Sequence, residues 1–291
     1  MEQKITKRKT KMINALTIDV EDYWSILQQD WLGRMDAKPT EAVLKNTRWF
    51  LDTFASRNVK ATFFILGEVA QAFPQLIKEI ADQGHEIGVH GFYHRQIFKL
   101  KPDQFKNDIG AAKKLLEDIS GKQVFGHRAP AFSINKDTQW ALEVLEELGY
   151  KYDSSITPMA GKRYGWPGFK KEIHEMKLPN GKSIIEVPMS TITILGKELG
   201  IGGGYTRHFP YFYTKWAINH TQKTRPAVIY MHPYEIDLDQ SRYYDFDIPA
   251  DVQKKLAKVH RFQIRNRKFT KYKLEKLLSC FEFTSIINLL N

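Results

Sequence analysis

The sequence is nearly free of cysteine: Cys280 is the only one in 291 residues. One thiol cannot form an internal disulfide, and it excludes a zinc site built from several cysteines. Any metal bound by this chain must therefore be held by histidine and carboxylate side chains.

Long apolar runs are also missing. The first twelve residues, MEQKITKRKTKM, are basic, but no apolar segment of signal-peptide length follows them. No apolar run is long enough to cross a bilayer. These absences predict an unexported, soluble protein of the cytoplasm.

Acidic residues are fewer than basic ones, 33 against 44, which gives a net charge of +11. Much of the excess lies in residues 1–12 and in residues 254–276. The second stretch has helical spacing, so it is either a solvated helix face or a contact for anionic phospholipid heads or lipid-linked glycans. No nucleic-acid-binding signature accompanies it, so we expect no nucleic-acid partner and allow a peripheral position at the inner face of the membrane.

Short β-rich runs alternate with amphipathic helical segments along most of the chain. Repeated strand-then-helix units imply a parallel sheet, open or closed into a barrel. Polar motifs fall where the strands end, which favours the barrel. The expected strands are 14–20, 59–66, 85–90, 124–130, 150–155, 183–190, 191–195 and 226–233, and the expected helices are 40–58, 68–84, 102–121, 135–149 and 211–223.

The chain shows no internal repeat and no linker. At 291 residues it is long enough for one large α/β domain. We therefore predict a basic extension (1–12), a (β/α) barrel domain (13–248), and a C-terminal helical appendix (249–291) that packs on the barrel.

Three carboxylates follow the first expected strand, in the string TIDVED: Asp19, Glu21 and Asp22. Acidic residues before a helix can simply stabilise its N-terminus. Three carboxylates in such a small space also repel one another, and a bound cation or shared protons relieve that repulsion. The cluster therefore suits metal binding and general-base chemistry as well.

Three further strand ends carry unusual groups. His90 and His94, in GVHGFYHR, are four residues apart, so both imidazoles can reach one ion. Arg128 precedes the rigid Pro130 and could hold a carboxylate ionised through a paired contact. His232 ends an apolar strand in VIYMHPYEID. Each of these residues could by itself serve only the fold. Together they supply a metal site, a general base and a general acid, which are the groups that a metal-dependent hydrolase needs.

The motifs resemble the polysaccharide deacetylases of carbohydrate esterase family 4, and within it the branch found in exosortase-associated exopolysaccharide loci. The matching strings occur in family order and cover nearly the whole chain. They are IDVEDYW, GHEIGVHGFYH, GHRAPAFSI, YDSSI, GGGYTRHFP, YMHPYEID and RNRKFTKYKLEKLL. The resemblance implies a distorted (β/α) barrel with fewer than eight strands.

The resemblance also implies a role for each key residue. Asp19 matches the catalytic base, Arg128 the arginine that orients it, and His232 the acid that protonates the leaving amine. His90 and His94 match the two metal-binding histidines. The implied reaction is metal-dependent removal of an N-acetyl group from an amino sugar of a polysaccharide or glycolipid precursor, in envelope or exopolysaccharide synthesis. Zn²⁺ is the expected ion, with Co²⁺, Ni²⁺ or Mn²⁺ as alternatives.

The first motif departs from the usual family pattern of two adjacent aspartates, because Val20 separates Asp19 from the next acids. Glu21 and Asp22 then compete to be the third metal ligand, and we slightly prefer Asp22. The usual tryptophan is missing from YDSSI, which leaves the support of His232 open. Asp153 could bond to His232, or it could be a turn residue at the end of its strand.

Four residues are expected to contact the substrate. A backbone N–H near Ala131 would stabilise the oxyanion, and Phe132 is the aromatic residue of the arginine motif. In the branch that this chain resembles, the GGGYTRHFP loop lies near the active site, which makes Tyr205 and Arg207 candidates. Two other functions stay open: hydrolysis of a small amide or ureide, and glycan binding without catalysis.

Overall fold

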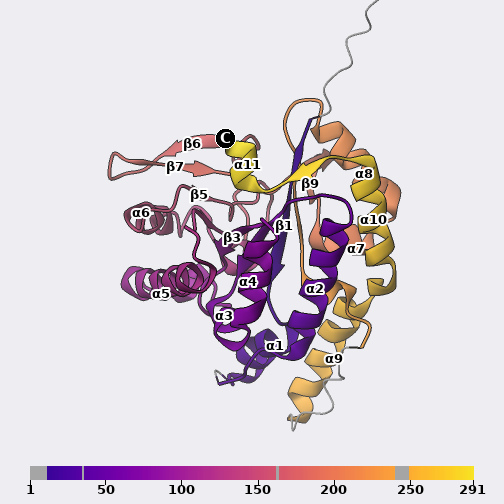
Figure 1. The fold of residues 1–291 in the computed structure, drawn as a ribbon, viewed down its shortest axis with the longest axis horizontal. Coiled ribbons are helices and arrows are strands. Elements are labelled where there is room, and N and C mark those ends of the chain that lie inside the picture. Colours follow the sequence, from indigo (N-terminus) through magenta and orange to yellow (C-terminus); the bar gives the residue numbers. More distant parts are fainter. Residues whose placement is uncertain (1–11, 35, 162–163, 240–248) are drawn as a thin grey trace, which may run out of the picture.

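The computed structural model describes residues 12–34, 36–161, 164–239 and 249–291. Of the basic extension expected at 1–12, all but Met12 lies outside the described residues. A mainly parallel sheet forms the centre, with helices packed around it (Figure 1).

The sheet has the strand order β10-β1-β2-β3-β4-β5-β7-β6, and all neighbours except β7 and β6 run parallel. In the described residues no ladder joins β10 to β6, so the sheet curls without closing. The predicted distorted barrel is confirmed as this curled, open form. The expectation of fewer than eight strands was wrong, because the polar edge strand β6 and the short β11 (Phe283–Thr284) bring the sheet to nine strands in the described residues. The strands are β1 (Asn14–Val20), β2 (Thr62–Ile65), β3 (Glu86–Val89), β4 (Gly126–His127), β5 (Tyr152–Asp153), β6 (His174–Lys177), β7 (Ser183–Glu186) and β10 (Val228–Met231).

Strand β1 lies between β10 and β2 in the sheet, and all seven of its residues are buried. Continuous apolar sequence is typical of a parallel strand that is covered on both faces. Helices α2 (Glu41–Ala55), α4 (Pro74–Asp82), α5 (Pro102–Ser120) and α6 (Trp140–Glu147) cover the outer side with apolar faces. This burial fixes the strand register and therefore which side chains leave each strand end.

Two sequence expectations needed correction. The helix expected at 68–84 is divided into α3 (Gly67–Ala72) and α4, because Pro74 starts a new helix. Strands β6 and β9 (Lys197–Gly200) were not predicted. Both are rich in polar residues and lie at hairpin edges, with β9 pairing antiparallel to β8 (Thr191–Ile194), so they lack the apolar signal of the central strands.

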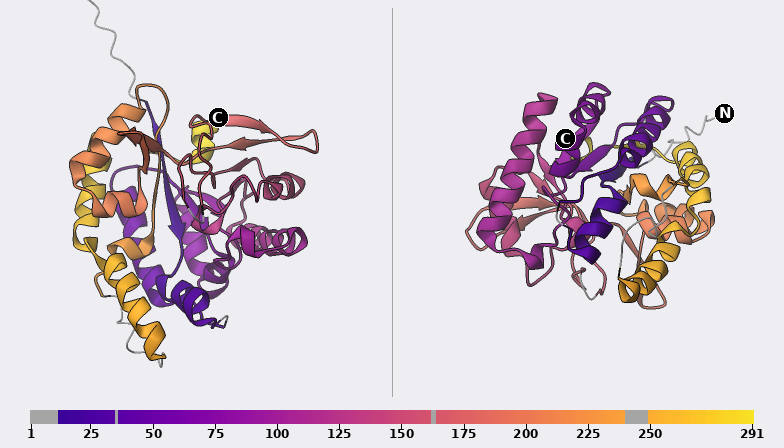
Figure 2. Two further views of the ribbon diagram at one scale, coloured as in Figure 1. Left: turned by 180° about the vertical axis from the view of Figure 1, so that it is seen from behind. Right: turned by 90° about the horizontal axis from the view of Figure 1, so that it is seen from below.

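The C-terminal part is mostly helical, as expected, with α9 (Ala250–Ile264), α10 (Thr270–Cys280) and α11 (Ile286–Leu290). Between α10 and α11 the short β11 (Phe283–Thr284) pairs with the start of β1, so this part also joins the sheet. Helices α8 (Tyr211–Thr221), α9 and α10 lie along one flank in opposite views, with α7 (Gly203–His208) inside them (Figures 1 and 2). None of the helices in the described ranges is long and apolar enough to span a membrane.

Candidate active site

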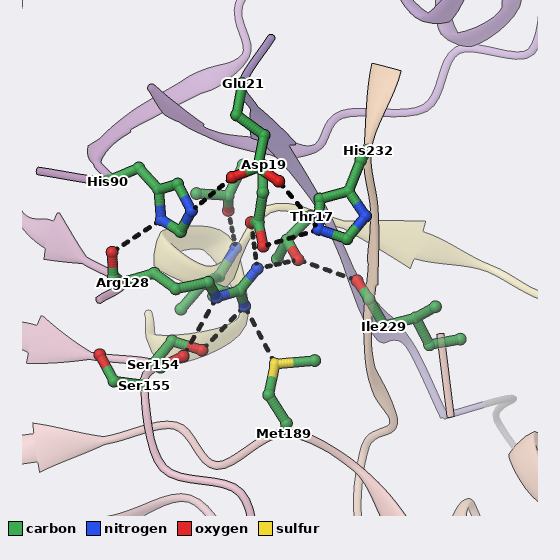
Figure 3. Close-up of polar contacts among 12 residues, drawn as sticks. Thr17, Asp19, Glu21, His90, Arg128, Ser154, Ser155, Met189, Ile229 and His232 are labelled. Atoms are coloured by element: carbon green, nitrogen blue, oxygen red, sulfur yellow. Dashed lines mark hydrogen bonds and ion pairs between the residues drawn. The ribbon is translucent and has the colours of Figure 1, made fainter. Parts of the chain in front are cut away.

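The predicted key residues meet at one edge of the sheet. Asp19 lies near the end of β1, and Glu21 directly follows this strand. His90 follows β3, Arg128 follows β4 and His232 follows β10. Because parallel strands end at the same edge, these side chains converge although they are far apart in sequence (Figure 3).

Glu21, His90 and His94 form a cluster with the geometry of a metal site. Oε2 of Glu21 lies 3.2 Å from Nε2 of His90 and 3.2 Å from Nε2 of His94. One ligand atom from each residue lies within 4.8 Å of the others. Two imidazoles and a carboxylate are a ligand set of catalytic zinc sites, which leaves a coordination position for water or substrate.

The surroundings of the two histidines also fit a metal. His90 Nδ1 lies 2.8 Å from the carbonyl oxygen of Arg128, to which it can donate, and this leaves the Nε2 lone pair facing Glu21. On the far side of His94, Nδ1 lies 3.7 Å from Oδ2 of Asp30. Such outer partners orient ligating imidazoles and raise their basicity. The residues present therefore fit a divalent first-row ion, without selecting among zinc, cobalt, nickel and manganese.

The electrostatics of the cluster lead to the same conclusion. Burial alone would raise the pKa of Glu21, but the neighbouring histidines, His94 first among them, hold it well below its ordinary value. Burial alone would lower the pKa of His94, but Glu21 and Asp30 raise it to about 10. The buried carboxylate thus stabilises positive charge at this point, and a divalent ion can take the place of the proton.

The preference for Asp22 as the third ligand was wrong in this structure. The Asp22 carboxylate caps α1 (Tyr23–Leu32), accepting hydrogen bonds from the backbone N–H groups of Trp24 and Ser25 at 3.0 and 2.8 Å. Its other oxygen accepts a bond from the Thr40 hydroxyl at 2.6 Å. Asp22 is therefore a helix cap, and Glu21 is the carboxylate beside the histidines.

Asp19 and Arg128 form a fully buried ion pair. Nη1 of Arg128 donates to Oδ1 of Asp19 at 2.6 Å, and also to the Thr17 hydroxyl at 2.6 Å. Nε and Nη2 donate to the carbonyl and hydroxyl oxygens of Ser154, and the guanidinium lies 4.2 Å from the centre of the Phe64 ring. The arginine is held on all sides, so it fixes the orientation of the Asp19 carboxylate.

His232 faces the same centre from the opposite side. Its Nε2 lies 3.9 Å from Oδ2 of Asp19 and 3.6 Å from Oε1 of Glu21. Burial would lower the pKa of His232, but the carboxylates of Glu21, Glu235 and Asp19 raise it. A protonated imidazole beside a carboxylate is a proton donor and a proton acceptor in one site.

Glu235, and not Asp153, supports His232. The Glu235 carboxylate lies 3.3 Å from Nδ1 of His232 and accepts a bond from its backbone N–H at 3.2 Å. Asp153 instead contacts Nδ1 of His127 at 2.7 Å and accepts a bond from the Ser155 N–H, as the turn interpretation expected. The hypothesis of an Asp153–His232 bond was therefore wrong.

Arg207 was expected to contact substrate, and the structure corrects this as well. The side chain is buried and is not among the residues that line the cleft. Its Nε lies 3.2 Å from Oε1 of Glu235, and its Nη1 donates to the backbone carbonyl oxygens of Phe262 and Gln263 in α9. Arg207 thus positions Glu235, which in turn positions His232.

Arg207→Met is expected to lower kcat by roughly 10–100-fold. KM and metal content should change little, because Arg207 orients Glu235 and His232, which are not members of the metal cluster. Arg207→Lys should recover part of the loss, since it keeps a cation beside Glu235. Steady-state kinetics and metal analysis check this, with the exposed Arg261→Met as matched control. Full kcat in folded Arg207→Met protein would contradict the positioning role.

The remaining predicted contacts do line a cleft above the cluster. It has a volume of about 320 Å³ and holds Asp19, Glu21, both metal-site histidines and His232. Ala131 and Phe132 form one wall, both in the left-handed region with φ of 53° and 51°. Strained backbone of this kind is concentrated at functional sites. Tyr205 lines the cleft together with four further tyrosines: Tyr23, Tyr164, Tyr230 and Tyr234.

These features place a metal-type cluster, a buried ion pair and a histidine at one end of a curled α/β sheet, and comparisons with known proteins find family matches to parts of the chain. Residues 35–152 match the family model "Polysaccharide deacetylase", and residues 154–291 match a "Domain of unknown function (DUF3473)". The chain therefore contains a domain of the polysaccharide deacetylase family, which confirms the resemblance at the level of that family.

Curated relatives carry deacetylase activities in their names. The chain is 38% identical over 133 residues to a peptidoglycan-N-acetylglucosamine deacetylase of Bacillus cereus, covering 42% of this chain and 48% of the relative. It is 29% identical over 132 residues to a peptidoglycan-N-acetylmuramic acid deacetylase of Bacillus subtilis, covering 43% and 49%. The chain thus spans about half the length of these relatives.

Solved structures confirm the fold. Puue allantoinase superposes with a TM-score of 0.57 at 15% identity, covering 94% of this chain and 87% of that one. The peptidoglycan N-acetylglucosamine deacetylase Bc1960 gives 0.50 at 17% identity, covering 96% and 88%. Asp19 and Glu21 precede the first family match, whereas Arg207, His232 and Glu235 lie in the second. The site therefore draws on the chain before the deacetylase match and on both matched regions.

Proposed function

We propose that this chain is a metal-dependent N-deacetylase that removes acetyl groups from amino sugars of a polysaccharide or glycolipid precursor. The observation that carries the proposal is the arrangement in one cleft of a three-ligand cluster, a buried Asp19–Arg128 pair and His232. The family match and the names of the curated relatives support the same class of substrate.

The cluster of Glu21, His90 and His94 would hold the ion, with Zn²⁺ as the first candidate and Co²⁺, Ni²⁺ or Mn²⁺ as the others. When bound, such an ion supplies Lewis-acid polarisation of the acetamide carbonyl and of water. A backbone N–H near Ala131 would add a hydrogen bond to the developing oxyanion.

Asp19 acts as the general base. Its Oδ1 is occupied by Arg128, so Oδ2 is the atom available to take a proton from the attacking water. The buried guanidinium fixes the orientation of the carboxylate. Positioned bases of this kind contribute about 10²–10⁴-fold to the rate.

His232 acts as the general acid. It lies opposite Arg128 across Asp19, and Glu235 holds its Nδ1, so its Nε2 proton faces the cleft. The departing amine of the sugar would take this proton as the C–N bond breaks. Phe132 and Tyr205 supply rings that can pack against a pyranose.

The test is metal analysis of the purified protein combined with acetate release from N-acetylated amino-sugar oligomers and lipid-linked acetylated sugars. We expect one divalent ion per chain and release of acetate. Asp19→Asn should keep the metal and lose about 10²–10⁴-fold in kcat. No acetate from any acetylated amino sugar with Zn²⁺, Co²⁺, Ni²⁺ or Mn²⁺ present would overturn the proposal.

Two other outcomes of these assays would indicate one of the alternative functions. Turnover of a small amide or ureide such as allantoin, without acetate release from sugars, would indicate the related C–N hydrolase. Glycan binding that is unchanged in Asp19→Asn, with no turnover in the parent, would indicate a binding scaffold. As part of the same proposal we place the protein in the cytoplasm, at the inner face of the membrane, in envelope or exopolysaccharide synthesis.

A further inference from the structure

Large apolar side chains are exposed mainly on one flank of the molecule. Of the twelve that are most exposed among the described residues, seven lie on α8, α9 or α10 or within two residues of one of these helices. Phe212 is 71% exposed and Trp216 is 46% exposed, one helical turn apart on α8. The seven are Phe209, Phe212, Trp216, Phe262, Ile264, Phe269 and Tyr272. Exposed apolar groups in such number mark an interaction surface.

Contacts between the helices join these side chains into one surface. Phe262 of α9 stacks on His208, directly before Phe209, with ring centres 4.3 Å apart. The ammonium group of Lys276 on α10 lies over Tyr272 and also over Tyr211 of α8, at 4.5 and 5.6 Å. Helices α8, α9 and α10 lie along the same flank in both views (Figure 2). We name this surface, with the lysines and arginines described next, the aromatic–basic face.

The charge on this face is mainly positive. The sequence contains no aspartate or glutamate from 199 to 234 or from 252 to 274, which covers α7, α8, most of α9 and the start of α10. Glu275 is the one acidic residue within α10. Exposed cations are interspersed among the aromatic residues: Lys215, Lys258, Arg261, Arg265, Lys268, Lys271 and Lys276. Aromatic and aliphatic groups mixed with Lys and Arg match the apolar boundary and anionic heads of a lipid surface.

The face lies beside the cleft. The ring of Phe209 stacks on Tyr205, which lines the cleft, with centres 6.0 Å apart and planes 5° apart. On α9, Gln263 lines the cleft while its neighbours Phe262 and Ile264 are exposed on the face. Any partner surface that binds the aromatic–basic face therefore lies next to the cleft.

We propose that the aromatic–basic face docks the protein on an anionic lipid membrane, so that the cleft works next to the bilayer on sugars carried by lipid. The evidence for membrane docking is the set of side chains on this flank. The further step, that the docked protein acts on lipid-linked sugars, rests on the proposed deacetylase function. Lysine and arginine supply attraction to the anionic heads, and Phe212 and Trp216 enter the interface.

The experiment is co-sedimentation of the full chain with vesicles of phosphatidylcholine alone and of phosphatidylcholine mixed with phosphatidylglycerol. We expect binding to the mixed vesicles only, weakened by salt. Lys215→Gln and Arg265→Gln should each weaken it by about fivefold, and the double variant Phe212→Ser/Trp216→Ser should weaken it further. The matched control is Phe98→Ser/Lys136→Gln, an exposed aromatic and an exposed lysine outside this face.

Each other outcome overturns the docking. If the protein does not bind the mixed vesicles, or if the control variant loses as much vesicle binding as the face variants, the proposed membrane contact is wrong. Binding of a single-stranded oligonucleotide without vesicle binding would indicate a nucleic-acid surface, and a dimer that Phe212→Ser/Trp216→Ser dissociates would indicate a second copy of the chain.

The deacetylase proposal is tested separately, by acetate release from a water-soluble acetylated oligosaccharide. We expect the parent protein to turn over lipid-linked sugar faster in mixed vesicles than in vesicles of phosphatidylcholine alone. The variants of the aromatic–basic face should lose this difference and keep the activity on the water-soluble substrate. Absence of acetate from all substrates would refute the deacetylase and leave the vesicle result standing.

Discussion

Glu21→Gln is expected to abolish tight metal binding and activity, whereas Asp22→Ala is expected to leave the metal in place. Glu21 supplies the anionic ligand between the two histidine nitrogens, at 3.2 Å from each. Changes to outer partners of a metal cost about 10–100-fold in affinity, so loss of the carboxylate ligand itself should cost more than about 100-fold. The neutral amide keeps the shape of the side chain, so the fold should survive.

Asp22→Ala serves as the matched variant, because it removes a neighbouring buried carboxylate with a different task. Loss of the N-cap of α1 should lower the free energy of unfolding by about 0.5–2 kcal/mol. Elemental analysis, isothermal titration with Zn²⁺ and chemical denaturation measure the two effects separately. Metal loss in Asp22→Ala with retention in Glu21→Gln would reverse the assignment.

The choice between these two acids shows what the sequence could have predicted. Side chains of a strand alternate between faces, so Glu21, two residues after Asp19, continues the side that carries the base. Asp22 falls on the opposite side, and α1 begins at the next residue, which is the pattern of an N-cap. The preference for Asp22 followed the residue type of the family and overlooked this alternation.

Strand β1 and the residues at the strand ends show why much of the site could be predicted from the sequence. The run Asn14–Val20 is apolar enough to specify a fully buried strand, and the structure begins and ends it at the predicted residues. Once the sheet is parallel, its topology alone brings Asp19, His90, Arg128 and His232 to one edge.

The support of His232 could not be predicted in the same way. Arg207 reaches Glu235 across 28 residues of sequence and Gln263 across 56. Contacts at that separation depend on how α7, η3 (Pro233–Ile236) and α9 pack, which no local periodicity specifies. A weaker signal was present, because Glu235 follows His232 by three residues, the spacing at which a side chain can return to the start of a helical turn.

Arg128→Met is expected to be the most destabilising single change in the site. It leaves Asp19 as an unpaired charge with 1% exposure and removes bonds to Thr17 and Ser154. Breaking one side of a buried ion pair costs about 3–5 kcal/mol. For a chain of this size the loss corresponds to a decrease in Tm on the order of 10 °C. Activity should disappear as well, because the base loses its orientation.

Adding Asp19→Asn to Arg128→Met should recover part of the lost stability and none of the activity, since it removes the buried charge together with the base. The exposed pair of Arg48 and Glu79, with nitrogen and oxygen 2.7 Å apart, provides the control. Arg48→Met should cost no more than about 1 kcal/mol, because water solvates both groups after the change. Chemical denaturation of the parent protein, Arg128→Met, the double variant and Arg48→Met measures these differences in the free energy of unfolding. Equal losses in Arg128→Met and Arg48→Met, or a double variant no more stable than Arg128→Met, would show that Asp19 does not depend on this arginine for its charge.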